Sequence, residues 1–299
     1  MRPSRWRPTA GSVLILVSLL TTACTGQAAT PPPIRPSVPA FSHVYLLVLE
    51  NKSLANVVDE PGLPFLNSLI AGYGLATNYK GISHPSQPNY IALFSGSTQG
   101  VHGDTPVNLS GRNLVDQLSQ HNKSWRVFAQ NVPLQCYLGE TAVGGADGTG
   151  TYARRHEPAI EFTNISTSET RCSNILNFSH FDPSAADFEM IVPNTCNDMH
   201  DCPEQVGDKF LKTFLGRLLD SPSFQQGGVL FITFDESDEY HSTDSLVPLI
   251  VVSNQVRAGF RSTTPHDHYS LLRTIEDAWK LGCLAQTCKA NNLAEFFQR

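Results

Sequence analysis

The 299-residue sequence lacks several features, and each absence excludes a class of protein. It has no apolar run long enough to cross a bilayer as a helix, because the run from Val13 to Leu20 is well below the ~18 apolar residues required. It lacks an excess of basic charge, since 21 Lys and Arg are set against 27 Asp and Glu, and this disfavours nucleic-acid binding. No internal repeat is visible, and the cysteines lack the paired C-x-x-C spacing of a structural zinc site.

The first 40 residues are typical of an export signal followed by a spacer. Three arginines (Arg2, Arg5, Arg7) precede the short apolar run, and small residues lead into Cys24, so we interpret residues 1–23 as a signal peptide. The segment before Cys24 resembles a bacterial lipobox, which would make Cys24 a lipidated first residue. Thr21 departs from that pattern, and cleavage by the ordinary signal peptidase near Ala29 is the alternative. Residues 24–40 form a proline-rich tether.

The cysteine count agrees with lipidation. Without Cys24 an even set of six remains, as expected for disulfides in an exported chain: Cys136, Cys172, Cys196, Cys202, Cys283 and Cys288. Cys196 with Cys202 and Cys283 with Cys288 are close enough to close small loops, which would leave Cys136 with Cys172. Other connectivities stay open at this stage.

Residues 41–299 alternate buried-strand patterns with helical patterns, which indicates a single α/β domain. Nearly continuous apolar runs predict strands of a mostly parallel sheet at 43–49, 227–234 and 246–253, with a weaker one at 125–129. Helices are predicted at 64–71, 88–94, 113–120, 206–219 and 269–279. The polar segment 139–194 shows little periodicity and is interpreted as loop and cap.

Two predicted strands end in pairs of potential metal ligands, Glu50-Asn51 and Asp235-Glu236. The carboxyl ends of strands in open α/β sheets are where ligands bind. Carboxylates gathered there repel one another unless a cation or protons intervene, and a hard divalent ion is the simplest choice. The alternative is that each pair caps the next element or faces solvent.

The segment SHPSQPNY places Ser86 at the start of a helix. A serine there is an ordinary N-cap, but the free N–H groups of a helix start also bind phosphate. A metal-coordinated hydroxyl in that position would be an activated nucleophile.

Imidazoles and arginines complete the candidate chemistry. The cluster Asn197-Asp198-Met199-His200-Asp201 lies between Cys196 and Cys202, and His266-Asp267-His268 precedes the last long helix. The histidines could serve proton transfer or phosphate contact, or only cap the helix or lie at the surface. Arg154 and Arg155 could clamp a phosphoryl group, although solvated surface arginines are the alternative.

Together these segments resemble the phosphoesterase family of acid phosphatases and phospholipases C, within the alkaline phosphatase superfamily. The segments that carry the resemblance are VLENKS, SHPSQPNYIALFSG, YARRHEP, NDMHD, TFDESD, VPLIVVS and HYSLLRTIED. The resemblance implies an α/β/α sandwich and a metal held by Glu50, Asn51, Ser86, Asp235 and Glu236. It also implies that Ser86 is the nucleophile.

Further roles follow from the same resemblance. His200, His268 and Asp201 would be catalytic, and Asn51, His84 and Arg154 would bind substrate. Glu236 stands where two-zinc members carry histidine, and only Asp198, His200 and His268 remain for a second metal, so one metal is expected.

The sequence therefore predicts an exported, metal-dependent acid phosphatase that hydrolyses phosphate monoesters through a phosphoserine intermediate. The divalent ion could be calcium, magnesium, manganese, iron or zinc. The expected partners are a small phosphomonoester or a phospholipid, and a membrane reached through the lipid anchor. The alternatives are a phospholipase C-like phosphodiesterase and a non-catalytic surface protein that binds phosphate or metal.

Overall fold

The computed structural model describes residues 1, 4, 37–144, 150–238 and 246–297. Residues Pro36–Arg299 form one compact unit. The predicted signal peptide, Cys24 and most of the tether lie outside the described residues.

An eight-stranded sheet forms the centre of the described structure. Its strands, in spatial order, are β11 (Arg261–Ser262), β2 (Gly74–Ala76), β10 (Leu249–Val252), β9 (Val229–Phe234), β1 (Val44–Leu49), β8 (Phe188–Val192), β4 (Trp125–Ala129) and β7 (Ile175–Leu176). Every residue of β1, β8, β9 and β10 is buried, which explains the long apolar runs in β1, β9 and β10. Two small ribbons pair β12 (His266–Asp267) with β3 (Tyr79–Lys80), and β5 (Thr141–Val143) with β6 (Thr151–Ala153).

Most strand pairs are parallel, as predicted, but β10 is antiparallel to both β9 and β2. Its apolar run reflects burial on both faces, and burial alone does not reveal strand direction. The predicted loop segment 139–194 is also corrected, since it contains β8, which pairs with β1 and β4 inside the sheet.

The five predicted helices are present, and three further short α-helices are not among the predictions. The α-helices are α1 (Pro64–Gly72), α2 (Ser86–Ser95), α3 (Leu114–Gln120), α4 (Thr163–Ser166), α5 (Glu169–Cys172), α6 (Glu204–Leu219), α7 (Pro222–Gln225) and α8 (His268–Trp279). The 3₁₀ helices are η1 (Leu54–Asn56), η2 (Arg154–His156), η3 (Pro158–Glu161), η4 (Phe178–His180), η5 (Ala285–Lys289) and η6 (Ala294–Phe297). α1 packs on α6, and α2 packs on α8.

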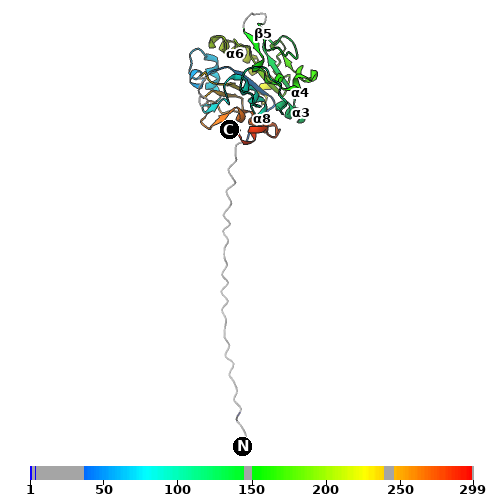
Figure 1. Ribbon diagram of the computed structural model, residues 1–299. Coiled ribbons are helices and arrows are strands. Elements are labelled where there is room, and N and C mark those ends of the chain that lie inside the picture. The colour runs from blue at the N-terminus through cyan, green and yellow to red at the C-terminus, as the bar shows by residue number, and fades with distance from the viewer. Residues whose placement is uncertain (2–3, 5–36, 145–149, 239–245, 298–299) are drawn as a thin grey trace. The chain divides into compact units, whose positions relative to one another are not determined.

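Local signals explain where the helices begin and end. Asn113 caps α3 by accepting from the Asp116 N–H, and Asp267 caps α8 in the same way from Ser270. Figure 1 shows α3 beside α4, where the Asn164 amide donates to Asp116 at 2.8 Å. Gly96 ends α2 with a φ of 70°, and a side chain there would collide with the Leu284 carbonyl.

Candidate active site

The register of the two central strands brings the first four candidate ligands together. Leu49 of β1 pairs directly with Phe234 of β9, so the residues that follow leave the sheet side by side at its carboxyl edge. Asn51 adopts a left-handed φ of 54°, and its backbone N–H donates to Asp235 Oδ1 at 3.1 Å. Asparagine tolerates that conformation better than most residues. The turn therefore ties the end of β1 to the end of β9.

Ser86 is the first residue of α2 and lies within this cluster of acids. Its hydroxyl donates to Glu50 Oε2 at 3.0 Å. Burial raises the pKa of Asp235 to about 7 and that of Glu236 to about 9, and a hydrogen bond from the Ser86 side chain opposes the shift in both. The structure thus brings Ser86 next to three of the predicted carboxylate ligands.

The buried carboxylates fit a hard divalent cation. Burial, followed by the charges of Asp235 and Asp198, raises the pKa of Glu50 well above its ordinary value. Among the described residues, Asn51 Oδ1 and Asp235 Oδ2 are buried oxygens without a hydrogen-bond partner. Oxygen ligands of this kind suit Ca²⁺, Mg²⁺ or Mn²⁺, and a bound ion would satisfy them.

His156 belongs to this cluster, although the sequence analysis assigned it no role. Its Nε2 lies 3.4 Å from Glu50 Oε1 and its Nδ1 lies 3.2 Å from Asp198 Oδ2. Its ring stacks on Tyr90, whose hydroxyl donates to Glu50 Oε1 at 2.5 Å. The ligand atoms of Glu50, His156 and Asp198 all lie within 4.8 Å of one another, so they form a second possible set of metal ligands.

The contacts of Arg154 are all within the protein in the part of the chain that the structure describes, and its predicted role in substrate binding stays a prediction. Arg154 is buried, and its Nε and Nη2 donate to the two carboxylate oxygens of Glu161 at 3.1 and 3.0 Å. Its Nη1 donates to the Leu138 carbonyl at 2.6 Å. A guanidinium that is engaged in this way holds the segment that carries His156. The charge of the neighbouring Arg155 is among the influences that lower the pKa of His156, after burial.

The loop between Cys196 and Cys202 is docked on the end of β1. The Glu50 N–H donates to the Asp198 carbonyl at 2.9 Å, and the His200 N–H donates to Asp198 Oδ1 at 2.8 Å. The partly exposed His200 ring contacts Asp201 Oδ1 through Nδ1 at 2.6 Å, and its centroid lies 6.1 Å from that of His156. Asp198 is therefore inside the cluster, while His200 and Asp201 lie at its outer side.

The other two predicted histidines, His84 and His268, have different surroundings. His84 Nδ1 lies 2.6 Å from Glu236 Oε2, which places it beside the cluster. His268 is fully buried, with Nδ1 bonded to the Tyr79 hydroxyl at 2.8 Å and Nε2 bonded to the Asp235 carbonyl at 2.6 Å. Both of its ring nitrogens are engaged within the protein, and its predicted roles as catalytic residue and as second-metal ligand stay predictions. His268 positions the backbone of Asp235.

The three disulfides join the predicted pairs. They are Cys136–Cys172, Cys196–Cys202 and Cys283–Cys288. The second of them closes the loop that carries Asp198 and His200, so it constrains the site directly.

Comparison with known proteins identifies the family. The model of the Phosphoesterase family matches residues 48–282, a span that contains every candidate site residue named above. The chain belongs to the phosphoesterase family. Its fold is also that of a solved protein of the alkaline phosphatase superfamily from Vibrio parahaemolyticus, with a TM-score of 0.53 at 10% identity over 86% of this chain and 71% of that one.

Two relatives in this family carry functional names. A probable acid phosphatase of Kluyveromyces lactis is 30% identical over 81% of this chain and 59% of its own length. The phosphatidylinositol-3-phosphatase of Mycobacterium tuberculosis is 32% identical over 82% of this chain and 79% of its own length. This chain thus spans little more than half of the first relative. None of the helices within the described ranges is long and apolar enough to cross a membrane.

Proposed function

We propose that this member of the phosphoesterase family is an exported, metal-dependent acid phosphatase that hydrolyses phosphate monoesters through a phosphoserine intermediate on Ser86. The observation that carries the proposal is the Ser86 hydroxyl, which lies at the start of a helix and donates to Glu50 within a group of buried carboxylates. The names of the two relatives support a phosphatase.

The ligand set for one divalent ion is Glu50, Asn51, Asp235, Glu236 and the Ser86 hydroxyl. A bound ion would lower the pKa of a coordinated oxygen and offset the negative charge of the site. The remaining chemistry belongs to the chain. Ser86 Oγ attacks phosphorus and forms the Oγ–P bond, its proton passes to Glu50, which already accepts its hydrogen bond, and the bond from phosphorus to the leaving alcohol breaks. The N-terminal end of α2 favours the negative phosphoryl group.

His200 is the candidate acid for the leaving alcohol. Asp201 holds its Nδ1, so the ring is oriented and Nε2 carries the proton that is transferred. Water then hydrolyses the phosphoserine and releases inorganic phosphate.

Ser86→Ala tests the nucleophile. We expect loss of p-nitrophenyl phosphate hydrolysis by at least about 10³-fold, because the covalent step has no other hydroxyl in this position, with the thermal unfolding temperature retained. Ser83→Ala is the matched control, since Ser83 lies in the same segment and its hydroxyl donates to the neighbouring His84 carbonyl. Comparable turnover by a folded Ser86→Ala protein would refute the assignment.

The substrate arm compares p-nitrophenyl phosphate with bis-(p-nitrophenyl) phosphate and with a phosphoinositide monophosphate. Preference for the monoesters supports the proposal. Preference for the diester would instead support the phospholipase C-like alternative. Binding of phosphate without turnover would support the non-catalytic alternative.

Export is part of the same proposal. The short apolar run, Cys24 and the three disulfides support it. Metabolic labelling with a fatty acid, compared between the full chain and Cys24→Ser, tests the anchor. Loss of label in the variant supports lipidation, whereas an unlabelled protein recovered from the medium supports cleavage near Ala29.

A further inference from the structure

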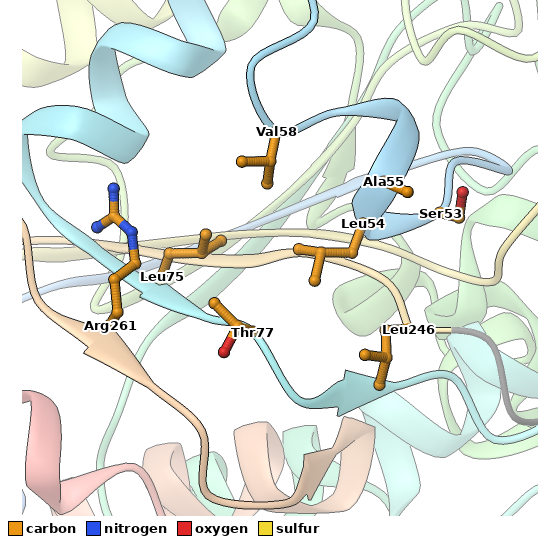
Figure 2. A pocket seen from close by; sticks show the side chains of 8 residues that line it. All are labelled: Ser53, Leu54, Ala55, Val58, Leu75, Thr77, Leu246 and Arg261. Carbon is orange, nitrogen blue, oxygen red and sulfur yellow. The ribbon is translucent and has the colours of Figure 1, made fainter.

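A cavity of about 440 Å³ lies at the edge of the sheet, outside the carboxylate cluster. Its walls come from η1, the end of β2, β11 and the segment before β10. Figure 2 shows Leu54, Val58 and Leu75 around its middle, with Arg261 at one end and Leu246 toward the other. None of its lining residues belongs to the candidate active site.

The strand order places one wall of this cavity at the edge of the sheet. Asp235 follows β9, and the order from β9 outward is β10, β2 and then β11, which carries Arg261. The opposite wall begins at Ser53, two residues after Asn51, so the cavity lies near the cluster but shares no residue with it. The structure gives the cavity no role in phosphoryl chemistry.

The lining of the cavity combines aliphatic side chains with the hydroxyls of Ser53 and Thr77 and with one cation, Arg261. Leu54, Val58, Leu75 and Leu246 present aliphatic carbon to it. A largely apolar cavity of this size is in the range that binds small ligands, and such cavities favour apolar occupants over water. The lining alone therefore indicates a hydrocarbon chain.

Arg261 supplies charge at the end of the cavity. Its Nη1 donates to the Phe260 carbonyl at 3.0 Å and to the Tyr73 carbonyl at 3.5 Å, and both acceptors are neutral. Within the described residues, no carboxylate forms an ion pair with it, and its side chain is exposed. A guanidinium with free donors beside an apolar cavity complements an anionic head group attached to an apolar chain.

We propose that this cavity binds a single-chain amphipathic anion, with the acyl chain among Leu54, Val58 and Leu75 and the anionic head on Arg261. A fatty-acid carboxylate and the phosphate of a lysophospholipid share this chemistry. The site goes beyond the proposed phosphatase activity, because it requires no contact with Ser86.

Binding is measured at pH 7.5 with 11-(dansylamino)undecanoic acid, whose fluorescence rises in an apolar site, followed by displacement with palmitate or lysophosphatidate. We expect saturable binding to the full chain. Arg261→Gln should weaken binding at least about 10-fold, and Val58→Phe, which fills the cavity, should abolish it. Arg257→Gln is the matched control, because it removes a neighbouring positive charge that stacks on Phe260 and does not line the cavity.

Displacement by palmitate and by lysophosphatidate shows which head group the site prefers, because the preferred ligand displaces the probe at the lower concentration. Thermal unfolding of each variant shows that it is folded. The proposal is overturned if the full chain does not bind the probe, if Arg261→Gln and Arg257→Gln bind it equally, or if dodecanol competes as well as palmitate. Repeating the titration with Ser86→Ala keeps the result separate from catalysis, so a failure here leaves the proposed function standing.

Discussion

The Arg154 guanidinium pairs with the buried carboxylate of Glu161, and within the described residues no other cation forms a salt bridge with that carboxylate. Glu161 also accepts from the Gln87 amide and the Val107 N–H, but neither of these carries charge. We expect Arg154→Ala to lower the free energy of unfolding by about 3–5 kcal/mol. Urea denaturation measures this change.

Arg155→Ala is the control for Arg154, because Arg155 is the adjacent arginine and forms no salt bridge within the described residues. Arg155→Ala should lower the free energy of unfolding by much less than Arg154→Ala does. Equal losses from the two substitutions would mean that the Arg154–Glu161 pair contributes little to stability.

A second prediction at the residue scale concerns Glu189, which lies in the middle of β8. Burial raises its pKa to about 8, while the ordinary value of about 4.5 applies to the unfolded chain. Below pH 4.5 both states are protonated and the stability is fully present. As the pH rises through 4.5 to 8 only the unfolded state loses its proton, so stability falls by as much as ~1.4 kcal/mol per pH unit.

Glu189→Gln cannot ionise and should remove this loss. The difference in unfolding free energy between Glu189→Gln and the parent protein, measured by urea denaturation from pH 5 to pH 8, should therefore grow in favour of the variant. A constant difference over that range would show that Glu189 ionises in the folded protein as readily as in the unfolded chain.

At the scale of elements, the Cys196–Cys202 disulfide holds the loop that docks on β1. Replacing both cysteines by serine should cost about 2–3 kcal/mol, and turnover should also fall because Asp198 and His200 lose their fixed positions. The matched control is the pair Cys283–Cys288, which closes a loop of similar length, with a separation of 5 residues against 6. Similar stability losses are expected, but a fall in turnover only for the first pair.

Purified variants assayed by p-nitrophenyl phosphate hydrolysis and thermal unfolding provide this comparison. If turnover fell equally in both double variants, the loss would reflect general destabilisation, and a specific role for the Cys196–Cys202 loop would be rejected.

The element scale also shows why some predictions failed. β1, β4 and β9 were predicted from their apolar runs, whereas the run of β8 contains Glu189, a carboxyl whose pKa is raised to about 8 by burial. β10 was found but its direction was not, because a strand buried on both faces has the same pattern in either direction.

At the scale of the whole molecule, metal binding and folding should be coupled. The folded chain gathers Glu50, Asp235 and Glu236 in a buried cluster, whereas the unfolded chain separates them. An ion that binds only the folded state at 100 times its Kd would stabilise it by about 2.7 kcal/mol. We therefore expect EDTA to lower both the unfolding temperature and the activity, and one restored divalent ion to raise both.

Glu50→Gln is the control for this coupling, because it removes a charged ligand while keeping the shape of the side chain. The restored ion should stabilise it less than the parent protein. If EDTA did not change the unfolding temperature of the parent protein, the result would argue against a bound metal ion.

The sequence by itself determined the α/β class, the carboxylates at the strand ends and Ser86 at a helix start, and it favoured the disulfide pairs of the structure without excluding others. These features are local, since strand burial, helix starts and short loops are recorded in neighbouring residues. Only the tertiary structure shows that His156 lies between Glu50 and Asp198 and that Arg154 forms a salt bridge with Glu161. It also shows that His268 is hydrogen-bonded to the backbone carbonyl of Asp235. These contacts depend on which distant segments of the chain pack together. The residues next to each side chain in the sequence do not indicate which distant residue it will contact.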